Sequence, residues 1–163
     1  MPETAASNHP PAVSEARVLP VRRVTVLAIS PFARDHVFLR NTFSHSKWRL
    51  RSVGSLREAR EYLRHDSRYV VICEKDLPDC TWKDILEELA VLEEPPPLIV
   101  TSRLADERLW AEVLNLGGYD VLAKPFDPLE VVRVVSLAWR HLWNNWERAR
   151  QNWRGLKIAA AGA

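Results

Sequence analysis

Five short apolar runs, each followed by a segment whose apolar residues have helical spacing, constrain the fold of this 163-residue chain most strongly. Strands that alternate with helices through short connections favour a parallel sheet with helices on both faces. We therefore expect a single α/β domain, a doubly wound three-layer sandwich of five strand–helix units. The predicted strands cover residues 24–29, 48–53, 69–73, 98–101 and 119–123.

Capping patterns place the helices between these strands. Ser30 followed by Pro31 predicts the start of the first helix, because serine caps helices and proline suits their first position. Ser55 with Glu58 three positions later is a capping-box pattern and predicts the second. Gly117 accepts the left-handed conformation that a helix end requires. The predicted helices cover residues 31–43, 55 onward, 81–92, 105–116 and 128–154.

The composition is that of an ordinary globular protein, with 47% hydrophobic and 27% charged residues. A formal net charge of +2 gives no global signature of nucleic-acid binding. Cys73 and Cys80 lack metal-site spacing, and we interpret them as a core residue and a loop thiol. No run approaches the roughly 18 apolar residues that cross a bilayer. We expect a reduced, soluble, cytoplasmic protein with a disordered arm at residues 1–20, which hold four prolines.

Two segments 50 residues apart carry a resemblance to a known family. The sequence Leu-Ala-Lys-Pro-Phe at 122–126, with Val-Ile-Cys-Glu-Lys-Asp-Leu-Pro at 71–78, resembles the receiver domains of bacterial response regulators. The resemblance covers about residues 22–142. It implies a flavodoxin-like fold with strand order 2-1-3-4-5, a receiver-like domain at 21–142 and a C-terminal helical extension with a frayed tail at 143–163.

The resemblance also implies a phosphoacceptor pocket, which this chain keeps only in part. In the family, an Asp on the third strand accepts the phosphoryl group and two acidic residues after the first strand hold magnesium. A hydroxyl residue and a Lys then contact the phosphate. Thr101 and Lys124 match the last two, whereas Glu74 falls on the acceptor position and Ser30 and Pro31 fall on the acidic pair.

These replacements predict an atypical pseudo-receiver without a magnesium site, and we expect no metal or other cofactor. Ser30 offers one neutral oxygen and Pro31 lacks a backbone N–H, while magnesium prefers carboxylates. We expect Glu74 and Lys124 to form an ion pair near Thr101, because an unpaired buried charge is costly. The alternative is that Glu74 is a tolerated polar residue at a strand end.

Other acidic residues near the predicted pocket have simpler interpretations. Asp76 and Asp79 are possible substitute acceptors, but loop residues of this kind more often form turns. Asp35 lies within the first helix, where we expect a solvated face. The position of the aromatic that moves with the hydroxyl residue in the family is occupied by Val121.

The last predicted helix runs more than ten residues past the usual end of such a domain. One face, with Val131 and Val134, suits packing on the sheet. A second stripe repeats every seven residues and is a predicted interaction surface, because heptad spacing marks helix-on-helix packing and tryptophan is frequent at binding hot spots. Val132, Trp139, Trp146 and Trp153 form this repeat, Trp143 lies at the interleaved heptad position, and Trp110 of the fourth helix is a further member of the predicted surface. We expect self-association through it; the alternative is that the helix folds back over its own domain.

The sequence therefore favours a signalling module of the two-component class that acts by protein–protein contact or as a homodimer, through the face of the fourth helix, fifth strand and fifth helix. One alternative is a working phosphoacceptor in a phosphorelay. Another is a nucleic-acid or membrane binder that uses the basic, Trp-rich C-terminal helix. We expect no enzyme, because the chain has no Gly-rich phosphate loop, nucleophile elbow or zinc-spaced His/Cys set.

Overall fold

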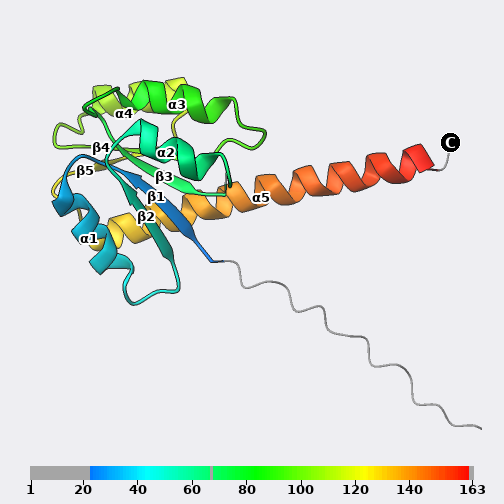
Figure 1. Ribbon diagram of the computed structural model, residues 1–163, viewed down its shortest axis with the longest axis horizontal. Coiled ribbons are helices and arrows are strands. Elements are labelled where there is room, and N and C mark those ends of the chain that lie inside the picture. Colours follow the sequence, from blue (N-terminus) through cyan, green and yellow to red (C-terminus); the bar gives the residue numbers. More distant parts are fainter. Residues whose placement is uncertain (1–22, 67, 162–163) are drawn as a thin grey trace, which may run out of the picture.

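The computed structural model describes residues 23–66 and 68–161, and these form a five-stranded parallel sheet between two layers of helices (Figure 1). The strand order is β2-β1-β3-β4-β5, and every neighbouring pair is parallel. The predicted fold class and strand order are therefore confirmed. The strands are β1 (Thr25–Ile29), β2 (Arg49–Val53), β3 (Val70–Glu74), β4 (Leu98–Ser102) and β5 (Asp120–Ala123).

Two separate hydrophobic clusters lie on the two faces of the sheet. Helices α1 and α5 cover one face and α2, α3 and α4 cover the other (Figure 1). Successive strand residues point to opposite faces, so Val71 enters one cluster and Ile72 the other. The helices are α1 (Ala33–Phe43), α2 (Leu56–Leu63), α3 (Trp82–Ala90), α4 (Glu107–Leu116) and α5 (Pro128–Ala161).

The helix termini follow the sequence signals, with one exception. The Ser55 hydroxyl accepts a hydrogen bond from the Glu58 N–H, and Gly117 ends α4 in the left-handed conformation. Ser30 was predicted to cap the first helix, and this is wrong. Helix α1 begins at Ala33 with Phe32 at its N-cap and no side-chain cap bond. The Ser30 hydroxyl accepts from the Phe32 N–H and donates its own hydrogen elsewhere.

Helix α5 has 34 residues, which corresponds to a length of about 50 Å. Its first turns pack on the sheet, and the helix then extends past the sheet (Figure 1), where Ala149, Arg150 and Trp153 line a hollow together with Glu93 and Glu94. The alternative that the helix folds back is therefore wrong. The helix also continues past the predicted end at 154, so residues 159–161 are helical rather than frayed. The arm predicted at 1–20 lies outside the described residues.

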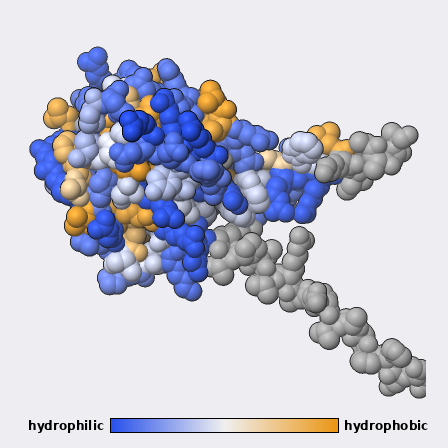
Figure 2. All heavy atoms as spheres, viewed as in Figure 1, coloured by the Kyte–Doolittle hydropathy of each residue, from blue (hydrophilic) through white to orange (hydrophobic). Residues whose placement is uncertain are grey.

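The surface in the view of Figure 2 is mostly hydrophilic over the domain, with apolar side chains in small separate groups. Within residues 23–66 and 68–161, no helix is both long and apolar enough to cross a membrane.

Candidate functional site

Because all five strands are parallel, their carboxyl ends meet at one edge of the sheet, where ligands of such folds usually bind. Ser30 directly follows β1, Glu74 is the last residue of β3, and Thr101 is near the end of β4. Lys124 directly follows β5, and its backbone N–H donates to the Ser102 carbonyl. The topology thus brings together side chains that are up to 94 positions apart in the sequence.

The ammonium group of Lys124 binds two carboxylates at this edge. It donates to Oε2 of Glu74 and to Oδ2 of Asp35. The side chains of Lys124 and Asp35 are each 6% exposed and that of Glu74 is 10% exposed, so the three charges are almost completely removed from water. The predicted ion pair between Glu74 and Lys124 is confirmed, and the alternative of a merely tolerated Glu74 is excluded.

Each carboxylate also accepts a hydrogen bond from a hydroxyl. Thr101 Oγ1 donates to Glu74 Oε2 at 3.2 Å, and Ser30 Oγ donates to Asp35 Oδ2 at 2.6 Å. Buried charges are stable only when they are paired and hydrogen-bonded. The five side chains therefore form one connected network, in which the hydroxyls of Ser30 and Thr101 are used by the protein itself.

Asp35 was predicted to lie on a solvated helix face, and this is wrong, because it is only 5% exposed. The buried residues of α1 are Asp35, Leu39 and Phe43, which recur every four positions and share one face. The sequence contained this signal, since Asp35 continues the apolar stripe of the helix by one turn toward the sheet edge.

Aromatic rings surround the ammonium group of Lys124. Its Nζ lies 5.0 Å from the ring centroid of Phe32 and 5.5 Å from that of Phe126. At this distance a cation gains favourable interaction with the ring faces. The peptide bond between Lys124 and Pro125 is cis.

The donor set at this edge does not fit a magnesium ion. Magnesium requires near-octahedral oxygen ligands, usually including carboxylates that are free to bind it. Ser30 and Pro31 supply no carboxylate, and those of Asp35 and Glu74 are bound by the Lys124 ammonium. Among the described residues, no group of three His, Cys, Asp or Glu side chains is arranged to hold a metal.

The substitute acceptors lie in the loop between β3 and α3. Asp76 forms an isolated bridge with Thr81 and accepts from the Lys75 ammonium at 3.4 Å. Asp79 is exposed. In the described part of the chain, neither carboxylate contacts Lys124 or Thr101, so the structure does not join them to the pocket. Val121 is partly buried and packs against the cluster on the α2–α3–α4 face.

The two cysteines are free thiols. Burial raises the pKa of Cys73 well above its ordinary value. Burial also raises the pKa of Cys80 to about 11, with a further contribution from the nearby Asp79 carboxylate. Both groups are therefore protonated, and weak nucleophiles, at neutral pH.

The structure divides the predicted interaction surface into two parts. Trp110 lies on α4, and its Nε1–H donates to Asp120 of β5 at 3.1 Å. The other residues lie on α5, on the opposite side of the sheet. Ring contacts connect Trp139 to Trp143 at 6.4 Å and Trp143 to Trp146 at 5.0 Å. Farther along α5, Trp153 is 62% exposed, whereas Val132 near the start of the helix is 37% exposed.

Comparisons with known proteins agree with this geometry. A family model described as the response regulator receiver domain matches residues 35–136. The hydrogenase transcriptional regulatory protein HoxA of Cupriavidus necator is 31% identical over 120 residues. The match covers 72% of this chain and 24% of HoxA, so the chain spans about a quarter of that relative's length.

Solved structures of receiver domains share the fold. The signal receiver domain of an HD domain-containing protein from Pseudomonas fluorescens Pf-5 superposes with a TM-score of 0.72 at 23% identity, covering 83% of this chain and 99% of its own. The beryllofluoride-activated NtrC4 receiver domain, whose structure is a dimer, superposes with a TM-score of 0.67 at 16% identity, covering 72% of this chain and 98% of its own.

Proposed function

Since this chain belongs to the response regulator receiver domain family, we propose that it is a receiver of two-component signalling whose output is protein–protein contact without magnesium-dependent phosphorylation. On this proposal the chain has no enzymatic activity of its own. We place it in the cytoplasm, where free thiols such as those of Cys73 and Cys80 are usual.

The observation that supports this function is the shared use of Lys124 by Glu74 and Asp35. In a working receiver the Lys must be available to the phosphate, and a metal must neutralise the charge of the incoming group. Here the ammonium is bound by two buried carboxylates, and a phosphoryl group would have to break both contacts. A dianion beside two carboxylates would also be repelled strongly in a site of low dielectric constant.

The hydrogen-bonded network around Lys124 also suggests how the pocket keeps a single conformation. Glu74 is one methylene longer than Asp, so its carboxylate reaches Lys124 and the Thr101 hydroxyl from the end of β3. In this proposal the Asp35–Lys124–Glu74 network replaces the metal and phosphate and keeps the pocket in one state.

We propose that the partner surface includes the projecting part of α5 and that a second copy of the chain occupies it. The ring contacts among Trp139, Trp143 and Trp146 fix the side chains in place, which reduces the entropy lost on binding. Trp153 follows Trp139 and Trp146 at seven-residue spacing and is exposed. Heptad repetition suits packing against another helix. A dimeric receiver is known in the NtrC4 structure.

The test is intact-mass spectrometry of the chain after incubation with acetyl phosphate and magnesium, with an ordinary receiver domain as the positive control. We expect no gain of phosphoryl mass by this chain while the control is modified. A magnesium-dependent adduct that peptide mapping places on Glu74, Asp76 or Asp79 would overturn the proposal and support the phosphoacceptor alternative.

A further inference from the structure

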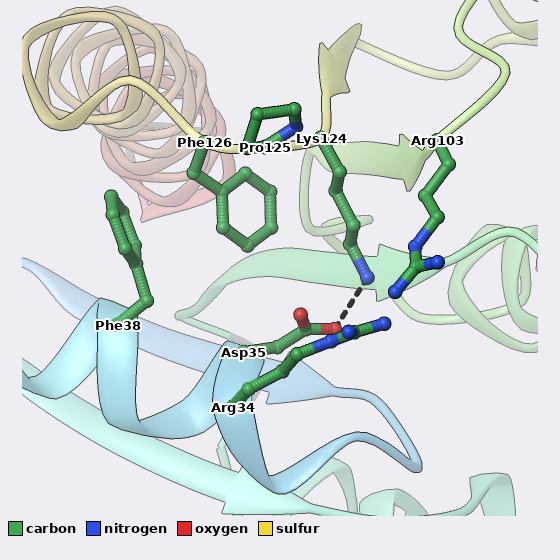
Figure 3. A pocket seen from close by; sticks show the side chains of 7 residues that line it. All are labelled: Arg34, Asp35, Phe38, Arg103, Lys124, Pro125 and Phe126. Atoms are coloured by element: carbon green, nitrogen blue, oxygen red, sulfur yellow. Dashed lines mark hydrogen bonds and ion pairs between the residues drawn. The ribbon is translucent and has the colours of Figure 1, made fainter.

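A cavity of about 460 Å³ lies beside the Lys124 network, and Lys124 and Asp35 form part of its lining (Figure 3). Its volume is within the range of small-molecule sites in proteins, about 300–1,000 Å³. The walls come from α1, from the loop after β4 and from the connection between β5 and α5. The cavity therefore opens at the edge of the sheet where the elements of this fold usually meet a ligand.

One side of the cavity is aromatic. The rings of Phe38 and Phe126 face each other with centroids 5.3 Å apart and an interplanar angle of 44°. Pro125 extends this apolar wall. Both rings are only partly buried, so their cavity side is available to a flat apolar group. Offset and tilted ring contacts of this kind are favourable beyond the area that they bury.

The other side is cationic. Figure 3 shows the guanidinium ends of Arg34 and Arg103 directed to the part of the cavity near the Lys124 ammonium. Within residues 23–66 and 68–161, neither guanidinium forms an ion pair; Arg34 lies over the Phe32 ring at 5.2 Å. A single unpaired surface arginine is ordinary. Two that are directed to one cavity from different elements give this side of the cavity a positive charge, which favours an anion there.

Among the residues that the structure describes, no carboxylate forms an ion pair with either guanidinium. Asp35 also lines the cavity, but it accepts from the Lys124 ammonium and the Ser30 hydroxyl. An arginine fork suits the planar, two-oxygen geometry of a carboxylate, and it also binds phosphate. The cavity thus combines an anion-binding side with an aromatic side.

We propose that this cavity binds a small aromatic anion, with its acidic group between Arg34 and Arg103 and its ring on Phe38 and Phe126. In this proposal the two arginines hold the anion, and the site differs from the phosphoacceptor position because Thr101 and Glu74 are not among the residues that line the cavity. It would give the domain an input from a small molecule, in addition to the contacts made by α5. The proposal is independent of whether the chain is phosphorylated.

The experiment is titration of the ¹⁵N-labelled full chain with sodium 1-naphthoate, followed by ¹H–¹⁵N NMR in the absence of magnesium and phosphoryl donors. We expect saturable shifts at the Arg34 and Arg103 Nε–H signals and at the Phe38 and Phe126 amides. Arg34→Gln and Arg103→Gln are each expected to weaken the affinity at least tenfold. Arg40→Gln, an exposed substitution on the same helix, is the matched control and should leave the affinity unchanged.

Two further probes separate the contributions of charge and ring. The neutral 1-naphthalenemethanol keeps the ring and should bind at least tenfold more weakly than 1-naphthoate. Inorganic phosphate keeps a negative charge and lacks the ring, and it should also bind at least tenfold more weakly. Equal binding of either probe would overturn the proposal, as would naphthoate affinity that is unchanged in both arginine variants. Shifts confined to the α5 tryptophans and abolished by Trp153→Ala would place binding there and would likewise overturn it.

Discussion

The ammonium group of Lys124 donates to a carboxylate of Asp35, a residue of α1 that lies 89 positions earlier in the chain. The same ammonium binds Glu74, so one cation compensates two almost fully buried carboxylates. The acidic pair expected after β1 is absent from Ser30 and Pro31, and α1 instead supplies one carboxylate from its first turn. This carboxylate, that of Asp35, accepts hydrogen bonds from Lys124 and Ser30 within the protein.

Loss of the shared cation should destabilise the fold. Lys124→Met leaves Asp35 and Glu74 buried beside each other without a counter-ion, and removal of one partner of a buried pair typically costs about 3–5 kcal/mol. We expect a decrease of at least about 3 kcal/mol in the free energy of unfolding, measured by urea denaturation. Adding Asp35→Asn and Glu74→Gln to Lys124→Met should recover most of that loss.

A matched lysine provides the control for this series. Lys83 forms an ion pair with Glu112 on the surface, where both side chains are more than one third exposed. Lys83→Met should change the free energy of unfolding by less than about 1 kcal/mol, as is usual for surface pairs. Similar losses for Lys83→Met and Lys124→Met would contradict the structural role given to the network.

Restoring the missing carboxylates should restore the family's chemistry. The triple variant Ser30→Asp, Pro31→Asp and Glu74→Asp supplies the oxygen ligands that magnesium prefers and an acceptor of the usual length. We expect a magnesium-dependent gain of phosphoryl mass at position 74 on incubation with acetyl phosphate. Glu74→Asp alone should show no gain, because it lacks the metal ligands. Phosphorylation of that single variant would show that the acidic pair is dispensable here.

The projecting helix should control the oligomeric state. Truncation after Leu142 removes the C-terminal part of α5 and keeps Leu142 and the buried residues that precede it in the helix. We expect the full chain to sediment as a dimer and the truncated chain as a folded monomer in analytical ultracentrifugation. Because aromatic packing drives the contact, dimerisation should change little between low and high salt, whereas electrostatic binding to nucleic acid weakens steeply with salt.

Two single substitutions, one in the predicted surface and one outside it, test whether α5 forms the dimer interface. Trp153→Ser removes the most exposed tryptophan of the predicted surface, and it should weaken the dimer. Val91→Ser removes an apolar side chain that is 83% exposed elsewhere on the domain, and it should have no effect. A dimer that survives both truncation and Trp153→Ser would move the interface away from α5, for example to the region of Trp110.

Cys80 should react slowly with alkylating agents. Burial, together with Asp79, raises its pKa to about 11, so only about one thiol in a thousand is ionised at pH 8. The alkylation rate by iodoacetamide, followed by peptide mapping, should rise nearly tenfold per pH unit between pH 8 and 10. Asp79→Asn should increase the rate at pH 8, because it removes a negative charge that disfavours the thiolate. A rate that is already at its plateau at pH 8 would contradict this assignment.

Gly118 is required by close packing after α4. A Cβ atom at this position would lie 2.4 Å from Val113 Cγ1 and 2.9 Å from the Val113 carbonyl oxygen. Gly118→Ala should therefore lower the free energy of unfolding by about 1–3 kcal/mol, the usual cost of overpacking. The control is Gly54→Ala, whose added methyl group would meet only Glu58 Oε1 at 3.8 Å. Thermal unfolding of both variants is the measurement.

The strands and helices were predictable because their signals are local. Apolar periodicity, a serine cap at Ser55 and the helix-ending Gly117 each involve a few neighbouring residues, and the structure confirms them. The Glu74–Lys124 pair was also predictable, once the parallel topology placed both residues at the same edge of the sheet. These are the features that sequence reasoning can obtain from spacing and from elementary electrostatics.

Asp35 and Ser30 were misassigned because their roles depend on Lys124, which lies 89 positions after Asp35 and reaches it only in the folded structure. Their local sequence suggests a solvated helix and an N-cap, whereas Lys124 and the fold draw the Asp35 carboxylate inward. The predicted interaction surface stays a prediction. The structure places its seven-residue repeat on α5 and places Trp110 on α4, where the indole donates to Asp120 of β5.

Helix α5 is fixed at its first turns and extends far from them, so a small rotation at its base moves its tip by a larger distance. Its base is fixed in the core through Val131, Val134 and Val135, and it begins two positions after Phe126, a wall of the aromatic cavity. Over a rigid rod of about 50 Å, a tilt of about 2° at the base displaces the tip by about 2 Å. A displacement too small to disturb the sheet would thus become larger at Trp153, and it would change the position of this side chain relative to the second copy that we propose to pack on it.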